Sequence, residues 1–246
     1  MEQEKIWRDS ELFQRTEMLL GVDAVKVLAR SRVAVFGVGG VGGYAVEVIA
    51  RSGVGFIDLY DNDTVSASNI NRQLLATTST IGCHKVDVAV KRVTDINPQC
   101  QVRGFKMFYV VKNADEVDLS QYDYVVDCID TVSAKMELVR RCTRLKVPII
   151  CSMGAANKLD ASAFVVADIS ETDIDPLARI MRKKLRKEGI EHFKCVFSKE
   201  QPRKPLDDEQ DIRPVPASNA FVPAAAGIIL GGEVVLDLVR NAGVEL

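Results

Sequence analysis

The stretch Arg32–Gly43, with the sequence RVAVFGVGGVGG, constrains the fold of this chain more than any other. An apolar, β-branched run leads into closely spaced glycines, and a helical pattern follows. Gly37, Gly39, Gly40 and Gly42 allow a tight turn and a close approach to a phosphate, which the amino end of the next helix attracts. The stretch therefore predicts a nucleotide site and leaves the nucleotide open.

A second strand is predicted at Phe56–Tyr60, and it ends at Asp61. The spacing from the last glycine of the turn to this acid is typical of a βαβ unit in which a carboxylate at the tip of the second strand binds a ribose hydroxyl. Turn, helix and acid together favour a nucleotide-binding unit more strongly than the glycines do alone.

Strands and helices alternate along the first two thirds of the chain, which predicts an α/β fold with a Rossmann-like, doubly wound, mostly parallel sheet. Residues 7–30 read as two short helices broken at Gly21. From Gly154 the pattern changes to a short antiparallel extension, and residues 199–219 are expected to form a mobile loop or a cover. We expect one domain over residues 1–246, with a nucleotide-binding core at 31–153 and a C-terminal extension at 154–246. Further strands are expected at 102–108, 124–128, 147–152, 163–166 and 195–198, and further helices at 44–51, 82–96, 133–145, 175–187 and 227–240.

The composition fits a soluble cytoplasmic protein, with 47% apolar residues and a net charge of −2. The six cysteines are scattered without a Cys-x-x-Cys pair, which favours reduced thiols and excludes a four-thiolate zinc site. The N-terminus is charged and has no apolar h-region, so no secretory signal is expected. The apolar run 220–239 is interrupted by Pro223, Glu233 and Asp237, so a buried helix is favoured over a membrane span.

Polar residues that follow the predicted strands indicate which reaction the nucleotide undergoes. Because the carboxyl ends of parallel strands share one crevice, Gly37, Asp61 and Asp130 should converge. Arg72 and Lys85 would add positive charge there, and Asp130 a hard oxygen ligand for Mg²⁺. A departing pyrophosphate needs such groups, whereas hydride transfer does not. The pattern favours adenylyl transfer over an NAD-linked oxidoreductase.

These motifs, in this order, resemble the adenylation domain shared by ubiquitin-activating enzymes and the bacterial activators of the molybdopterin and thiamine sulfur carriers. The resemblance covers residues 15–154. It implies that Gly37, Gly39, Gly40 and Gly42 hold the phosphates of ATP. It also implies a ribose contact for Asp61, phosphate contacts for Asn69, Arg72 and Lys85, and Mg²⁺ on Asp130; Asp63 belongs to the same nucleotide-binding set. An N-terminal arginine, matched by Arg15, often reaches into the partner's site, so a homodimer is expected.

Motifs in the C-terminal third of the chain point to one branch of this family. INP at 96–98, GAANKLD at 154–160, the segment 168–187 and VFSKE at 196–200 are similar to the tRNA threonylcarbamoyladenosine dehydratases. This implies ATP-dependent cyclisation of threonylcarbamoyladenosine beside the anticodon, with tRNA as partner, a monovalent cation (Na⁺ or K⁺) and a sulfur-transfer protein as a further partner. The alternatives are an activator of a sulfur-carrier or ubiquitin-like protein, and a non-catalytic nucleotide-sensing scaffold.

Residues 176–204 carry a net charge of +7, while the remainder of the chain carries −9. Leu177, Ile180, Met181 and Leu185 fall on one face of the predicted helix. The opposite side should display the residues that we expect to bind RNA, which are Arg179, Arg182, Lys183, Arg186 and Lys187. The alternative is a solvated helix without a ligand.

Several other residues have both a functional and a structural interpretation. Cys151 and Cys195 are the first candidates for a thioester nucleophile, but core packing is favoured for both. His84 and His192 lack a paired nucleophile and are expected at the surface or in helices. Asp160, Asp168 and Asp173 could form a monovalent cation site, or could serve as caps and turns.

Overall fold

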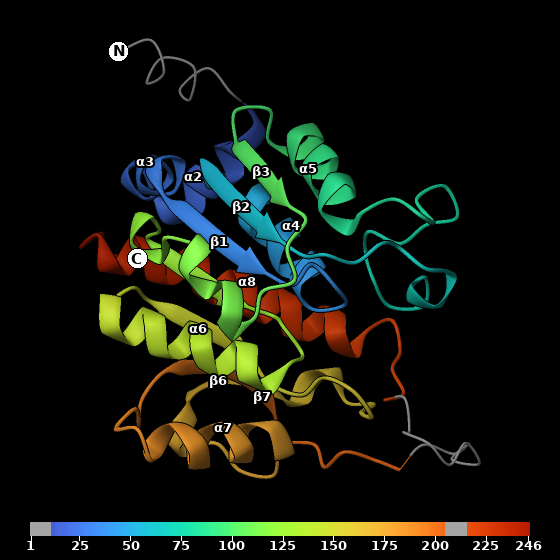
Figure 1. The fold of residues 1–246 in the computed structure, drawn as a ribbon. Helices are drawn as coiled ribbons and strands as arrows, with labels where there is room; N and C mark the ends of the chain where they lie inside the picture. Colours follow the sequence, from blue (N-terminus) through green and yellow to red (C-terminus); the bar gives the residue numbers. More distant parts are fainter. Residues whose placement is uncertain (1–10, 205–215) are drawn as a thin grey trace.

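The structure, a computed structural model, describes residues 11–204 and 216–246. Trp7 of the first predicted helix and residues 205–215 of the predicted loop lie outside these ranges. The described strands form one seven-stranded sheet in the order β3-β2-β1-β4-β5-β7-β6 (Figure 1). All neighbours pair in parallel except β6, which is antiparallel to β7. The strands are β1 (Arg32–Phe36), β2 (Phe56–Tyr60), β3 (Gln101–Phe105), β4 (Tyr124–Asp127), β5 (Ile149–Ser152), β6 (Phe164–Asp168) and β7 (Lys194–Ser198).

Helices cover both faces of the sheet, so the predicted doubly wound arrangement is confirmed (Figure 1). The first face packs against α3, α4, α5 and α8, and the second against α6, α7 and the 3₁₀ turns η3, η4 and η6. The α-helices are α2 (Gln14–Leu20), α3 (Val22–Arg30), α4 (Gly42–Arg51), α5 (Lys85–Ile96), α6 (Val132–Leu145), α7 (Pro176–Arg186) and α8 (Val222–Asn241). The 3₁₀ turns are η1 (Glu11–Phe13), η2 (Ala67–Asn69), η3 (Val111–Glu116), η4 (Leu119–Gln121), η5 (Ala161–Ala163) and η6 (Ile169–Glu171).

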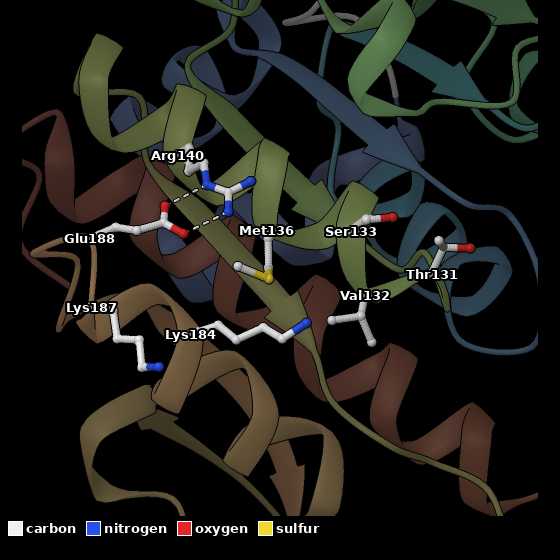
Figure 2. A pocket seen from close by; sticks show the side chains of 8 residues that line it. All are labelled: Thr131, Val132, Ser133, Met136, Arg140, Lys184, Lys187 and Glu188. Atoms are coloured by element: carbon white, nitrogen blue, oxygen red, sulfur yellow. Dashed lines mark hydrogen bonds and ion pairs between the residues drawn. The ribbon is translucent and has the colours of Figure 1, made fainter.

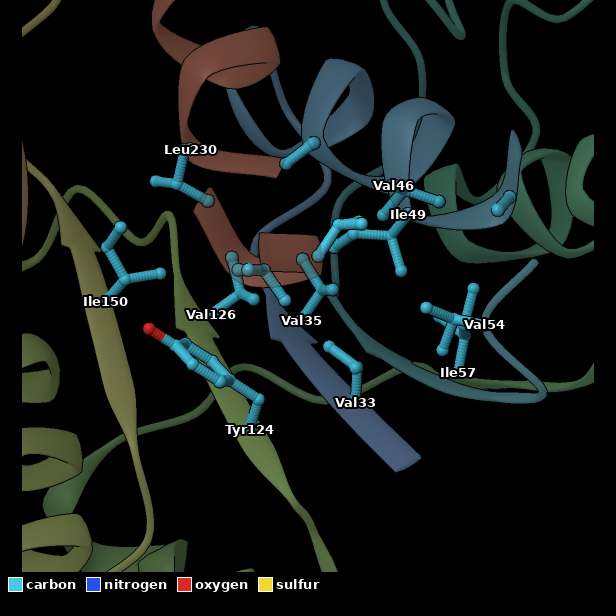
Figure 3. Close-up of a cluster of buried hydrophobic side chains, with 14 of the residues drawn as sticks. Val33, Val35, Val46, Ile49, Val54, Ile57, Tyr124, Val126, Ile150 and Leu230 are labelled. Carbon is cyan, nitrogen blue, oxygen red and sulfur yellow. The ribbon is translucent and has the colours of Figure 1, made fainter. Parts of the chain in front are cut away.

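The central strand β1 supplies side chains to both hydrophobic cores, because successive residues of a strand point to opposite faces. Val33 and Val35 lie in the core under α4 and α8, which Figure 3 shows together with Leu230 of α8. Ala34 and Phe36 lie in the core under α6 and α7. This two-sided burial explains why the strand reads as a continuous apolar run.

The C-terminal helix differs from its predicted bounds. It begins at Val222, five residues before the predicted start at Gly227. A Cβ on Gly227 would lie 2.3 Å from the carbonyl oxygen of Val41, so this glycine permits close packing of α8 on α4 and does not mark a helix start. By length and composition α8 could span a membrane, but it packs along α4 in the first core.

The extension after residue 153 completes the sheet of the nucleotide-binding core. Strand β7 pairs in parallel with β5, and β6 adds the predicted antiparallel pair at the edge. The sheet edge at which β1, β2, β4 and β5 end is called the carboxyl edge below. The loop after β5 and the amino end of α7 meet there, because the buried side chains of Lys158 and Asp175 lie 3.5 Å apart.

Candidate active site

The glycine turn between β1 and α4 lies at the carboxyl edge, and two of its glycines are required by the backbone. Gly37 has φ +86, and a Cβ there would lie 2.8 Å from the carbonyl oxygen of Cys128. A Cβ on Gly42 would lie only 1.8 Å from the carbonyl oxygen of Gly37. At Gly39 the nearest atom to such a Cβ is 3.9 Å away, and at Gly40 it is 3.4 Å away. The first pair therefore shapes the turn, and the second pair leaves its surface open.

The open part of the turn presents unused backbone donors. The amides of Gly39, Gly40 and Val41 donate no hydrogen bond to the residues that the structure describes. They precede α4, a helix of 10 residues whose positive end adds to their attraction for an anion. The turn can therefore bind phosphate groups, as its sequence predicts.

Asp61 directly follows β2 and is tied to the turn. One of its carboxylate oxygens accepts a hydrogen bond from the amide of Val38 at 2.8 Å, and the other accepts one from the amide of Asp63 at 2.8 Å. A carboxylate has further acceptor capacity, so Asp61 can still accept a ribose hydroxyl. It lies where the sequence predicts the ribose contact.

Lys85 is the first residue of α5, and its side chain is only 6% exposed. Its Nζ lies 2.7 Å from a carboxylate oxygen of Asp63, which is 64% exposed. Asp63, predicted as a nucleotide contact, therefore holds the ammonium group of Lys85 at the end of β2. The pairing fixes a cation beside the glycine turn.

Arg72 and Asn69 come from the polar segment around η2. The side-chain oxygen of Asn69 accepts a hydrogen bond from the amide of Ser66 at 3.1 Å, so Asn69 caps this turn of chain. Arg72 donates to the carbonyl oxygen of Ser68 at 2.9 Å, and its Cγ lies 3.7 Å from a Cβ built on Gly40. Arg72 therefore reaches the glycine turn, and Asn69 shapes the segment that carries it.

Asp130 approaches the turn from the end of β4. Cys128 donates its amide to the carbonyl oxygen of Phe36 at 2.8 Å, and its own carbonyl faces Gly37. The carboxylate of Asp130 is exposed and makes one long hydrogen bond, from Thr131 at 3.3 Å, but no ion pair with the residues that the structure describes. An unpaired carboxylate at this edge fits a Mg²⁺ ligand, because Mg²⁺ sites combine one or two carboxylates with substrate phosphates and water.

Three buried side chains that shape the site were not among the predicted site residues. Lys135 of α6 and Asp127 of β4 form a fully buried ion pair at 2.8 Å, and together they hold the peptide groups of Ile129. Gln73 is buried beside Gly39, and its side-chain oxygen has no partner among the described residues. A lysine on the apolar face of a predicted helix was a usable signal for Lys135. Gln73 adjoins Arg72 in the polar segment, but nothing in its type marked it.

Arg15 does not join the other site residues within one chain. It is exposed on α2, which lies near the opposite, amino end of the sheet (Figure 1). The neighbouring ring of Phe13 would contact a Cβ on Gly53 at 3.5 Å, and Gly53 precedes β2. Any role for Arg15 at an ATP site therefore requires a second copy of the chain.

The basic helix α7 forms as predicted, but the exposure of two of its side chains differs from the prediction. Ile180, predicted to be inside, is 42% exposed. Arg182 is partly buried and donates to the carbonyl oxygen of Thr172 at 2.6 Å, so part of its hydrogen-bonding capacity is used within the fold. A shallow groove of about 490 Å³, called the outer basic face below, is nevertheless lined by all five predicted RNA-binding residues: Arg179, Arg182, Lys183, Arg186 and Lys187.

Two of the three aspartates considered for a cation site, Asp160 and Asp168, are far apart. Asp160 and Asp168 each cap a 3₁₀ turn, accepting from the amides of Ser162 and Ser170. Asp168 is the last residue of β6, whereas Asp160 precedes η5, which leads into the first residue of that strand. The five-residue strand alone spans about 13 Å, so the two carboxylates cannot share an ion. The capping interpretation holds for both.

The cysteine side chains argue against a thioester nucleophile. All six are free, and Cys151 and Cys195 are fully buried. Burial raises the pKa of the Cys195 thiol to about 12 and also raises the pKa of Cys151. Such thiols stay protonated and inaccessible, as the core interpretation predicts. His192 lies at the surface beside Asp168, and His84 precedes α5.

Comparison with known proteins agrees with this arrangement. The ThiF family profile matches residues 13–236. The tRNA threonylcarbamoyladenosine dehydratase of Bacillus subtilis is 46% identical over 245 residues, covering 95% of this chain and 96% of the relative. The E. coli tRNA N6-threonylcarbamoyladenosine dehydratase solved with AMP superposes with a TM-score of 0.87 at 32% identity, covering 95% of this chain and 96% of that one. The same enzyme solved with ATP gives a TM-score of 0.84 at 31% identity, covering 94% and 95%. The chain belongs to the ThiF family.

Proposed function

We propose that this chain is an ATP-dependent RNA-modifying enzyme that cyclises threonylcarbamoyladenosine in tRNA beside the anticodon, with loss of water. The observation that carries the proposal is the convergence of the glycine turn, Asp61, Lys85 and Asp130 at the carboxyl edge. Relatives named for this activity, one of them solved with ATP and AMP, support the choice of substrate and nucleotide.

The first step is adenylation of the substrate. The free carboxylate of the threonyl group attacks the α-phosphorus of ATP, and the bond from that phosphorus to the bridging oxygen of the β-phosphate breaks. The products are an acyl-adenylate and pyrophosphate. Lys85 and Arg72 stabilise the negative charge that develops on the phosphates, because fixed cations cost no reorganisation when the charge appears.

The second step closes the ring. A nucleophile already within the same modified base attacks the activated carbonyl carbon, loses its proton, and displaces AMP. AMP departs with one oxygen of the former carboxylate, so the base loses the elements of water while ATP becomes AMP and pyrophosphate. Because the nucleophile is intramolecular, a high effective molarity replaces covalent catalysis. The buried, protonated state of Cys151 and Cys195 agrees with such a route.

Asp130 would hold Mg²⁺ together with the phosphates of ATP. When bound, Mg²⁺ supplies positive charge that neutralises the phosphate oxygens. The support is chemical, because the carboxylate is exposed and has no cationic partner among the described residues. A monovalent cation, Na⁺ or K⁺, stays a prediction without an assigned site.

A homodimer would complete the site with Arg15 from the other copy. Two apolar side chains on the same helix, Met18 and Leu19, are 81% and 83% exposed, which agrees with a covered surface in the assembly. A sulfur-transfer protein as partner and a cytoplasmic location stay predictions.

The proposal is tested by mass spectrometry of tRNA nucleosides after incubation with ATP and Mg²⁺. We expect the threonylcarbamoyladenosine peak to be replaced by one lighter by the mass of water. An unchanged peak would overturn the proposal. Pyrophosphate exchange that occurs only with a sulfur-carrier protein would instead identify an activator of that carrier.

A further inference from the structure

A groove of about 630 Å³ lies between α6 and α7 and reaches Thr131 at the start of α6 (Figure 2). None of the residues that line it was predicted as a site residue except Lys187. Its lining comes from the first turn of α6, the outward side of that helix and the end of α7. The lining residues are Thr131, Val132, Ser133, Met136, Arg140, Lys184, Lys187 and Glu188.

Some of the charged side chains in this α6–α7 groove are paired with one another, and others are not. Arg140 is bound by Glu188 through two hydrogen bonds of 2.6 and 2.7 Å, which tie α6 to the end of α7. Lys184 and Lys187 are exposed, and their ammonium groups make no ion pair or hydrogen bond with the residues that the structure describes. Figure 2 shows Lys184 extending from α7 across the groove toward Val132. The lysine charges therefore remain available to an anionic ligand.

The groove is continuous with the outer basic face of α7. Lys187 lines both surfaces, so the two adjoin along the last turn of the helix. At its other end the α6–α7 groove reaches Thr131, the residue after Asp130. A single positively charged track thus leads from the far side of α7 to the carboxyl edge.

The lining suits a nucleotide chain better than a small anion. Val132 supplies apolar surface beside the lysines, and Met136, which is 5% exposed, adds a small apolar contact to the lining. Single-stranded RNA offers that combination, with phosphates for cations and base faces for apolar side chains. A free phosphate would not use the apolar part.

We infer that the α6–α7 groove binds the single-stranded RNA segment next to the modified adenosine, with Lys184 and Lys187 on its phosphates. The inference rests on the proposed function and adds Lys184 to the RNA-binding residues. The Arg140–Glu188 pair acts by holding the two helices at a fixed separation. The track then delivers the adenosine to the edge where the glycine turn and Asp130 lie.

The test measures binding of a synthetic RNA stem–loop that carries threonylcarbamoyladenosine in its loop, over a range of salt concentrations. For Lys184→Ala we expect roughly tenfold weaker binding at low salt. The slope of the logarithm of the binding constant against the logarithm of salt concentration should become shallower by about 0.7, which corresponds to the loss of one single-strand phosphate contact. Lys184→Arg should keep both values near those of the wild type. The matched control is Lys91→Ala, which removes an exposed lysine from α5 on the opposite face of the sheet and should change neither.

Control measurements distinguish failure of the groove assignment from failure of the proposed function. ATP affinity and melting temperature should be unchanged in Lys184→Ala, because the residue is exposed and lies outside the glycine turn. If Lys184→Ala binds the stem–loop as tightly as Lys91→Ala, with the same salt dependence, the groove is not the RNA site. If the wild-type protein itself does not bind or convert the modified RNA, the proposed function fails instead.

Discussion

The buried ion pair between Lys135 and Asp127 gives the sharpest prediction about how the fold supports the site. Both side chains are 0% exposed, and their charged atoms lie 2.8 Å apart. Asp127 accepts a hydrogen bond from the amide of Ile129 at 3.1 Å, and Lys135 donates to the carbonyl oxygen of Ile129 at 3.1 Å. The pair therefore fixes both sides of the residue that precedes Asp130.

Lys135→Met would leave the Asp127 carboxylate buried without a counter-charge. Loss of one partner of a buried pair destabilises a fold by about 3–5 kcal/mol. The matched control is Lys106→Met. Lys106 also pairs with an aspartate at 2.8 Å, but that lysine is 47% exposed and its partner Asp87 is 56% exposed. An exposed pair is worth about 0–1 kcal/mol, so the free energy of unfolding from urea denaturation should separate the two variants clearly.

The pH dependence of the stabilisation by Lys135 follows from the pKa of its ammonium group. Burial opposes the charged form, but the Asp127 carboxylate outweighs it, and the pKa is raised. A raised pKa means that the stabilisation is fully present below the unfolded value of about 10.4 and is lost only as pH rises further. The contribution of the charged Lys135 to the stability of the wild-type protein should therefore be constant across the neutral range.

The double variant Asp127→Leu/Lys135→Met separates stability from activity. Without any buried charge, most of the lost stability should return. The peptide groups of Ile129 would still lack both partners, so pyrophosphate release should stay well below the wild-type rate. If Lys135→Met costs no more than Lys106→Met, or if the double variant is fully active, our account of this pair is wrong.

Three further outcomes are expected. Gly39→Ala should melt like the wild type but bind ATP weakly in calorimetry, because the nearest atom to a Cβ there is 3.9 Å away and the methyl group would occupy the phosphate surface. Gly42→Ala should instead lower the melting temperature, because its Cβ would lie 1.8 Å from a carbonyl oxygen. Equal melting temperatures and equal ATP affinities of the two variants would contradict this division. Asp130→Asn should fold normally and lose nearly all pyrophosphate release, and full activity would exclude Asp130 as a metal ligand. Urea unfolding should show falling stability as pH rises above 9, because burial raises the pKa of Cys142 and Cys195 to about 12 and only the unfolded chain ionises these thiols there; if Cys195→Ala leaves the slope unchanged, that thiol is not responsible.

Local patterns were sufficient for most of the fold. The second strand has its predicted bounds of Phe56–Tyr60, because its apolar run stops abruptly at Asp61. The third strand ends at Phe105, three residues before the predicted end, since the apolar residues beyond it pack in the second core without extending the ladder. The predicted start of α8 at Gly227 was wrong, because a glycine at a helix–helix contact looks the same in sequence as a glycine at a helix end.

Convergence at the carboxyl edge could also be predicted, because parallel topology dictates it for Gly37, Asp61 and Asp130. The partners of individual charged groups could not. That Asp63 pairs with Lys85, and that Arg182 turns inward to Thr172, depend on how distant segments pack. Residue type alone does not encode such pairings, so they required the structure.

In the proposed reaction the substrate carboxylate is activated as an acyl-adenylate. The most direct test uses tRNA whose threonylcarbamoyladenosine carries ¹⁸O in both carboxylate oxygens, followed by mass spectrometry of the nucleotide products. We predict that AMP gains one ¹⁸O, that pyrophosphate gains none, and that the cyclised nucleoside keeps the other. Unlabelled AMP formed alongside cyclised product would contradict adenylation of the carboxylate.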